Sequence, residues 1–163
     1  MKQASARRIE TVEPLRAGEH GGLLLGRLEP LLGYALRRAQ IRVFQDFEAE
    51  MKELGLTPGQ LGTLLLIEAN RGLSQTELGT ALGIDRSSVV PLIDRLQKRG
   101  WVRRAARASD RRAHALELAP GGSALLAKLM PRLEAHEARI AAALSPAERK
   151  LLLDILARVA IRT

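Results

Sequence analysis

The apolar residues of this chain recur at the helical period along most of its length. Between residues 32 and 54 they return every three or four positions, which predicts one helix of about 24 residues, roughly 35 Å long. Residues 122–143 and 146–161 repeat the pattern, and the apolar residues of the last segment are expected to be buried. Shorter helices are predicted at residues 57–69 and from Ser74 onward. The predicted fold class is therefore mainly α.

Three of the predicted helices share a start signal. A hydroxyl residue followed three positions later by Glu or Gln allows two unpaired backbone donors to be satisfied reciprocally. The signal occurs in Thr57-Pro-Gly-Gln60, Ser74-Gln-Thr-Glu77 and Ser145-Pro-Ala-Glu148. The helix from Ser74 is predicted to stop at Gly83, because glycine adopts the left-handed conformation that helix ends often need.

The stretch from Arg86 to Gly100 has two different faces. One face carries an apolar stripe with the spacing i, i+3, i+4 and i+7, made of Val89, Leu92, Ile93 and Leu96. The opposite face carries Ser87, Pro91, Asp94, Arg95 and Lys98. Pro91 has no donor for an interior helical hydrogen bond, so we expect a late or irregular helix start near Ser87 or Ser88. Both serines would then lie beside N-terminal backbone donors, which often bind phosphate.

Two short strands are predicted next, at residues 101–104 and 113–118, with an exposed, arginine-rich hairpin tip at residues 105–112. Two short helices joined by a glycine-containing turn have the plan of a helix-turn-helix, and a hairpin after the second helix is a wing. Arginine at a wing tip can enter the minor groove, and an aspartate two residues earlier can orient it. The alternative interpretation is an ordinary helical hairpin followed by a solvated charged turn.

The net charge of +8 is concentrated in one segment. Residues 86–112 contain nine basic and two acidic residues, which accounts for +7, so the rest of the chain is nearly neutral. A local surplus of this size favours a polyanionic partner, and nucleic acid is the partner that a helix-turn-helix would bind.

Composition excludes several other classes of protein. Four aromatic residues are too few for a single-strand binder that stacks bases, and the absence of cysteine removes thiol chemistry and cysteine-ligated zinc. We expect no metal and no cofactor, because the three histidines are scattered, and the His136-Glu137 pair is predicted to be a solvated helix surface. Ser87, Asp94 and His114 have no arrangement expected of a catalytic triad, so the chain is not predicted to be an enzyme.

The N-terminus lacks the order of a signal peptide, and no run of about 18 apolar residues occurs. We therefore expect a cytoplasmic protein without a membrane partner, whose residues 1–22 form a flexible tail. The predicted later parts are an N-terminal dimerisation helix region at 23–54, a winged helix-turn-helix domain at 55–118 and C-terminal dimerisation helices at 119–163.

The order and spacing of several motifs over residues 30–161 resemble the MarR family of winged-helix transcriptional regulators. These motifs are Leu56-Thr57-Pro58 with Gln60, Leu73-Ser74-Gln75, Leu82-Gly83-Ile84, Leu92-Ile93-Asp94-Arg95-Leu96, Lys98-Arg99-Gly100-Trp101-Val102, and Asp110-Arg111-Arg112-Ala113 followed by Leu116 and Leu118. The resemblance implies a homodimer that binds a palindromic double-stranded operator and releases it when a small anionic or aromatic ligand binds. It departs at Ala119, where the family often has a capping threonine.

Carried over by position, the resemblance and the charge pattern give a set of predicted DNA contacts. These are Ser74, Gln75, Arg86, Ser87, Ser88, Pro91, Arg95, Lys98, Arg103, Arg107, Asp110, Arg111 and Arg112. The predicted effector contacts are Tyr34, Arg38, Arg42 and Phe44, since an arginine fork beside an aromatic ring suits a carboxylate or a phosphate-bearing ligand. A solvated or inter-subunit salt-bridged helix face is the alternative for this second set.

Two other functions remain open at this stage. One is an architectural DNA-binding protein with weak sequence specificity. The other is a winged helix used only for protein contacts, which the concentrated positive charge disfavours.

Overall fold

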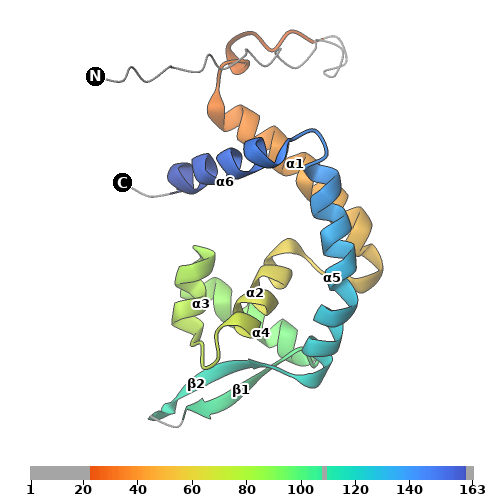
Figure 1. Ribbon diagram of the computed structural model, residues 1–163. Helices are drawn as coiled ribbons and strands as arrows, with labels where there is room; N and C mark the ends of the chain where they lie inside the picture. The colour runs from red at the N-terminus through yellow and green to blue at the C-terminus, as the bar shows by residue number, and fades with distance from the viewer. Residues whose placement is uncertain (1–22, 108–109, 161–163) are drawn as a thin grey trace, which may run out of the picture. The chain divides into compact units, whose positions relative to one another are not determined.

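The computed structural model describes residues 23–107 and 110–160, and for residues 106, 107 and 110–114 it describes the backbone alone. The elements are η2 (Gly26–Leu28), α1 (Leu32–Met51), η3 (Lys52–Leu54), α2 (Pro58–Ala69), α3 (Gln75–Leu82), α4 (Arg86–Lys98), β1 (Val102–Arg107), β2 (Asp110–Leu118), α5 (Pro120–Ile140) and α6 (Pro146–Ala160). Figure 1 shows this order, and the mainly α fold class with a β-hairpin wing is confirmed. The described residues divide into two compact units between Gln40 and Ile41, and the apolar core and the hairpin belong to the second unit.

All three predicted start signals are present as reciprocal hydrogen bonds. The Ser74 N–H donates to the Glu77 carboxylate at 2.7 Å, and the Glu77 N–H donates to the Ser74 hydroxyl at 3.2 Å. Equivalent pairs join Thr57 to Gln60 and Ser145 to Glu148. Gly83 ends α3 with a positive φ of 66°, as predicted.

The predicted continuous helix from 32 to 54 is wrong at its end. The α-helix stops at Met51, and residues 52–54 form a 3₁₀ turn closed by Gly55 in the left-handed conformation, with φ 57°. Ala119 precedes α5 without a side-chain cap, and Pro120 supplies the first helical residue.

The expected late start of the 86–100 helix is also wrong. The α4 helix begins at Arg86, because Asp85 caps it and accepts a hydrogen bond from the Ser88 N–H at 2.9 Å. Pro91 lies inside the helix on its exposed side. The carbonyl of Ser87, which loses its intrahelical donor to the proline, is therefore on the side that water reaches, and this reduces the penalty.

The strands are longer than predicted. Pairing runs from Val102 opposite Leu118 to Ala106 opposite His114, and an irregularity follows before Arg107 pairs with Asp110. Most of the expected hairpin tip at residues 105–112 is therefore strand. Leu73 adds an isolated bridge to the sheet, since the Leu116 N–H donates to its carbonyl at 2.7 Å.

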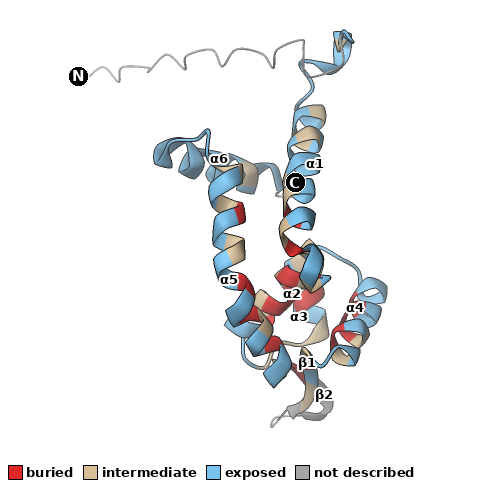
Figure 2. Cartoon of the chain, turned by 90° about the vertical axis from the view of Figure 1, so that its right-hand side faces the viewer, coloured by how far each residue is buried: buried red, intermediate tan, exposed pale blue. Residues whose placement is uncertain are grey.

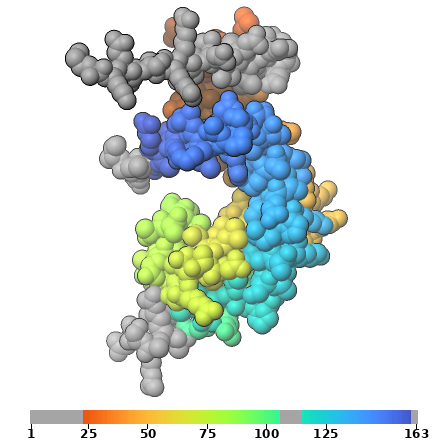
Figure 3. Space-filling view, viewed as in Figure 1, coloured from red at the N-terminus to blue at the C-terminus, as the bar shows by residue number. Residues whose placement is uncertain are grey.

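One core of apolar side chains joins α1 to α5 through the strands. Its fully buried members are Met51, Leu64, Leu78, Val89, Ile93, Leu96, Leu116, Leu126 and Leu129. Figure 2 shows buried positions on the inner sides of α2, α4 and α5, and Figure 3 shows the side chains of α2 and α5 in direct contact. The apolar stripe predicted for α4 is buried in full.

The expected burial of the last helix is not found in the single chain. None of residues 146–160 is buried in α6, and Leu151, Leu152, Ile155 and Val159 are 57%, 43%, 41% and 48% exposed. Their helical spacing nevertheless places several on one face, which remains uncovered within the second unit.

Gly122 provides a test of the packing between α5 and the turn before β1. A Cβ on Gly122 would lie 2.0 Å from the Trp101 carbonyl oxygen, whereas a Cβ on Gly59 would meet nothing within 4 Å. Gly122→Ala should therefore lower the free energy of unfolding by about 1–3 kcal/mol. Gly59→Ala, also in the first turn of a helix, should leave it unchanged or slightly raised. Urea unfolding measures both, and equal stabilities of the two variants would contradict the packing described.

Candidate nucleic-acid interface

The exposed face of α4 carries cations that form no ion pair with any other described residue. Arg86, Arg95 and Lys98 are exposed, and none forms an ion pair with a described residue. The opposite face of the same helix is buried, so the backbone that carries these cations is fixed by the core. This is the arrangement in which a helix can present several side chains to one groove of a duplex.

A carboxylate lies at the N-terminus of α4. The Ser87 hydroxyl donates to Asp85 at 2.5 Å, and the Ser88 N–H donates to it at 2.9 Å. These hydrogen bonds lower the pKa of Asp85, so the carboxylate is ionised. The predicted contacts Ser87 and Ser88 are exposed, as expected, but both are already bonded to an anion. Asp85 was missed as a cap, although an aspartate just before an apolar stripe is a start signal.

The α3 helix contributes the other side of a crevice of about 450 Å³ next to the start of α4, lined in part by Gln75, Thr76, Thr80 and Arg86. Of the two predicted contacts here, Ser74 is half-buried and occupied in capping α3. Gln75 lines the crevice and, with its amide oxygen turned toward Arg104, accepts from Nε at 2.8 Å.

Arg104 links three elements of the predicted DNA-binding domain. From β1 its guanidinium donates to Asp94 at 2.7 Å and to Gln97, both on α4, and it also reaches Gln75 on α3. Its side chain is 26% exposed. Arg104 was not among the predicted site residues, although the alternation along β1 places it on the same face as the buried Val102. It positions the helix and is not free to bind DNA.

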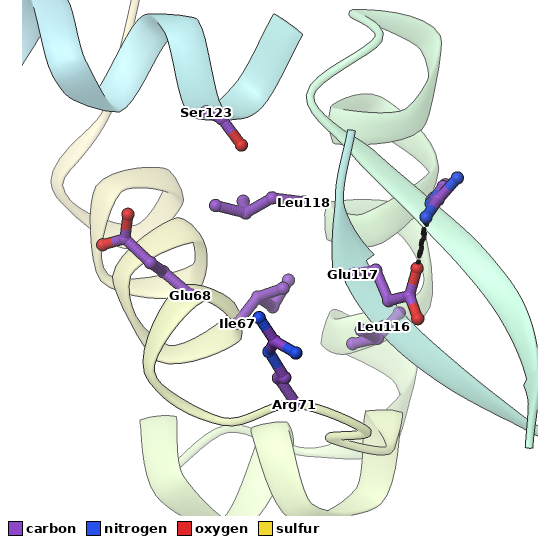
Figure 4. Close-up of a pocket in the computed structure, with 8 residues that line it drawn as sticks. Ile67, Glu68, Arg71, Leu116, Glu117, Leu118 and Ser123 are labelled. Atoms are coloured by element: carbon purple, nitrogen blue, oxygen red, sulfur yellow. Dashed lines mark hydrogen bonds and ion pairs between the residues drawn. The ribbon is translucent and has the colours of Figure 1, made fainter. Parts of the chain in front are cut away.

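Two further cations of the basic segment are also used inside the chain. Arg103, a predicted DNA contact, pairs with Glu117 across the hairpin at 2.7 Å, the dashed line in Figure 4. Arg99 donates to the carbonyl oxygens of Gly55 at 2.6 Å and Leu54 at 3.3 Å, and its Cζ lies 3.9 Å from the centre of the Trp101 ring. Nine basic residues in the segment therefore do not mean nine cations available to DNA.

The predicted wing contacts Arg107, Asp110, Arg111 and Arg112 have side chains outside the described residues. The backbone pairing of Arg107 with Asp110 puts them at the distal end of the hairpin.

A groove of about 350 Å³ lies between α1, α2 and α5. Its lining includes Phe44, Phe47, Leu61, Leu133 and His136. Among the four predicted effector contacts, Phe44 lines the groove. Arg42 is exposed and does not line it, and Tyr34 and Arg38 belong to the first unit.

The prediction of a solvated His136 is wrong. Its side chain is 3% exposed, and Nδ1 lies 2.6 Å from a carboxylate oxygen of Asp46 on α1. Arg139 donates to Asp46 at 3.1 Å and to Glu50 at 2.7 Å. Hydrogen bonds from Arg139 and His136 lower the pKa of Asp46 to about 2. The partner is 90 residues away in sequence, which is why periodicity alone missed the contact.

In the described part of the chain, no His, Asp and Glu side chains gather into a group that could hold a metal ion. None of the described helices has both the length and the apolar character needed to cross a bilayer.

Comparison with known proteins places this chain among transcriptional regulators. A family model described as "MarR family" matches residues 54–113. A putative transcriptional regulatory protein for the hcr operon of Thauera aromatica is 36% identical over 138 residues, covering 84% of this chain and 83% of that protein. The transcriptional repressor CouR bound to a 23-mer DNA duplex is 44% identical, with a TM-score of 0.80 over 85% of this chain and 99% of that one. CouR bound to p-coumaroyl-CoA is 42% identical, with a TM-score of 0.78 over 86% and 99%.

Because Arg104 donates to three side chains at once, we expect that a lysine, which keeps only the positive charge, cannot replace it. Arg104→Lys should lower the free energy of unfolding by about 1–3 kcal/mol, because an ammonium cannot reach Asp94, Gln97 and Gln75 together. The control is Lys150→Gln, which removes an exposed ion pair with Asp154 on α6 and should change stability by less than about 0.5 kcal/mol. Urea unfolding of both variants is the measurement, and wild-type stability of Arg104→Lys would rule out the bridge.

Proposed function

Because this chain belongs to the MarR family, whose members are DNA-binding transcriptional regulators and not enzymes, we propose that it is a repressor that binds a palindromic operator as a homodimer and is released by a small ligand. The observation that carries the proposal is the two-faced α4 helix. Its core side is completely buried, and its exposed side holds Arg86, Arg95 and Lys98 without an intramolecular partner among the described residues.

Each part of the α4 face has a role in this proposal. Arg95 and Lys98 lie on the outer face, where they reach base edges or phosphates in the major groove. Ser87, Ser88 and Pro91 lie nearer the N-terminus of α4, the end of a recognition helix that commonly contacts bases. Arg107, Arg111 and Arg112 extend the basic surface along the wing to the flanking minor groove, with Asp110 orienting Arg112.

Homodimer formation is supported by the uncovered apolar face of α6. Leu151, Leu152, Ile155 and Val159 are between 41% and 57% exposed, and monomeric proteins rarely leave such clusters in water. A two-fold symmetric dimer presents two α4 helices, which matches two half-sites of a palindrome.

The ligand part of the proposal rests on the groove between α1, α2 and α5. CouR, to which this chain is similar, has been solved with p-coumaroyl-CoA. The groove of this chain has an apolar wall with two phenylalanine rings, which favours an aromatic ligand.

The test of the proposed function is a competition between a palindrome from the promoter of the chain's own gene and random duplex of the same length. A repressor should bind the palindrome at least about 1,000-fold more tightly at physiological salt. An architectural protein would show a ratio near one, and a failure to bind either duplex would favour a protein-contact module. Fluorescence anisotropy at several salt concentrations gives both the ratio and the number of phosphates neutralised.

Substitutions on the proposed DNA face should weaken operator binding without affecting the fold. Arg95→Ala and Arg112→Ala should each cost about 1–3 kcal/mol of binding free energy if they contact bases or the minor groove. Lys52→Ala is the matched control, because Lys52 is an exposed cation on η3. Unaltered operator binding by Arg112→Ala would exclude the wing from the DNA contacts. Unaltered operator binding by Arg95→Ala would exclude the middle of α4 from them.

A further inference from the structure

The side chain of Arg99, the residue that ends α4, is held by three groups. Nη1 donates to the Gly55 carbonyl at 2.6 Å, Nη2 donates to the Leu54 carbonyl at 3.3 Å, and Cζ lies 3.9 Å from the centre of the Trp101 ring. Both carbonyl groups belong to the η3 turn that directly follows α1, and the last carbonyls of a helix carry a partial negative charge. Arg99 therefore joins the end of α4 to the end of α1.

The backbone of the η3 turn leaves room for this guanidinium. Gly55 has a φ of 57°, in the left-handed region that glycine adopts most readily. A Cβ at residue 55 would also lie 3.1 Å from Nη2 of Arg99. Any larger residue at this position would strain the backbone and crowd the guanidinium.

Trp101 connects the same contacts to the start of α5. The Ala119 N–H, just before α5, donates to the Trp101 carbonyl at 3.0 Å, and a Cβ on Gly121 in the first turn of α5 would lie 3.9 Å from the Trp101 ring. We call Leu54, Gly55, Arg99 and Trp101 the Arg99 node. It joins the end of α4 to both α1 and α5.

The other bonded arginines of the basic segment have partners of a different kind. Arg103 pairs with Glu117 inside the hairpin, and Arg104 on β1 pairs with Asp94 on α4. These bonds hold the winged helix-turn-helix part together, and they would persist if that part turned as one body. The bonds of Arg99 to the turn after α1 would not persist, so they oppose such a rotation.

The placement of α4 relative to α5 has a consequence for a dimer. The α5 helix leads to α6, whose uncovered apolar face supports the proposed homodimer. In a two-fold dimer built on that face, the position of α4 relative to α5 and α6 determines the distance between the two α4 helices. That distance has to match the spacing of the two half-sites of a palindrome.

We propose that Arg99 is a positioning residue that determines which half-site spacing the dimer accepts. One base pair added between the half-sites moves the second by about 3.4 Å along the duplex and turns it by about 34°. With the Arg99 node intact, α4 does not follow this displacement, whereas without the node α4 shifts and the altered spacing is tolerated. This inference rests on the proposed function as a dimeric repressor and adds the residue that selects the geometry of its operator.

The test uses three duplexes: the promoter palindrome, and the same palindrome with one base pair inserted or removed at its centre. In fluorescence anisotropy, the wild-type full chain should bind the unaltered palindrome at least about 10-fold more tightly than either altered one. Arg99→Lys keeps the charge but loses the planar group that donates to two carbonyls while stacking on Trp101, so this ratio should fall to about threefold or less.

The ratio separates positioning from stability. Arg99 is exposed, so Arg99→Lys should fold, and a partial loss of folded protein would raise all three Kd values alike without changing their ratio. The matched control is Arg132→Lys. Arg132 also donates to the end of α1, to the Glu50 carbonyl at 3.2 Å and the Glu53 carboxylate at 2.9 Å, but it lies on α5 and not on α4, so the wild-type ratio should be kept.

A second variant weakens the node without touching Arg99. Trp101→Phe keeps an aromatic ring but binds a cation less strongly than indole, so its ratio should be at least about twofold below that of the wild type. This variant decides the question if Arg99→Lys does not fold.

Three results would overturn the inference. These are a wild-type chain that binds all three spacings alike, a wild-type ratio in Arg99→Lys or, if that variant does not fold, in Trp101→Phe, and a ratio that falls equally in Arg132→Lys. Competition with random duplex on the same preparations keeps the two proposals apart. Preference for the palindrome with an unchanged ratio in the variants removes the role of Arg99 and leaves the repressor function standing, whereas a wild-type chain without that preference removes the repressor function itself.

Discussion

The structure depends on the α4 helix, one side of which is buried in the apolar core while the other side is exposed to water. Val89, Ile93 and Leu96 of α4 are fully buried, and each such side chain contributes on the order of 1.5–3 kcal/mol relative to exposure. The same burial fixes the rotation of α4 about its axis and therefore places Arg95 and Lys98 on the side that faces water. Around this helix, α2, α3, the strands and α5 supply the other half of one core. Stability and the presentation of charge are therefore consequences of the same packing.

Three arginines of the basic segment bind other parts of the domain, whereas Arg86 and Arg95 are exposed on α4. Arg104 ties β1 to the middle of α4 through Asp94, and Arg103 pairs across the hairpin with Glu117. Arg99, just after α4, fixes the end of η3 through two carbonyl groups. Planar guanidinium groups suit this work, since one group can donate to several acceptors at once. Some of the basic residues of the segment therefore stabilise the fold, and the net charge alone does not separate them from those available to a partner.

The sequence predicts best what is decided by near neighbours. The reciprocal caps at Thr57 and Ser74, the stop at Gly83 and the buried stripe of α4 involve residues within eight positions of one another, and all were predicted correctly. The errors arose where distant residues decide. His136 is buried because Asp46, 90 positions earlier, lies against it, and the strands extend because each supplies the other with partners. Pro91 was misjudged for another reason: the Asp85 cap outweighs a proline whose lost hydrogen bond is on the solvent side.

The α1 helix lines the groove and is also connected to the end of α4. Phe44 and Phe47 of α1 line the groove, Asp46 of α1 orients His136, and the turn that follows α1 ends in the carbonyl groups that Arg99 binds. A ligand that moves the phenylalanine rings therefore acts on the same helix whose far end is attached to the end of α4. Such contiguity does not by itself set the strength of coupling. In the proposed function, a ligand shifts DNA binding only by the difference between its affinities for the DNA-bound and the free arrangement of α4. The hydrogen bonds of Arg99 join the end of α4 to the turn that follows α1.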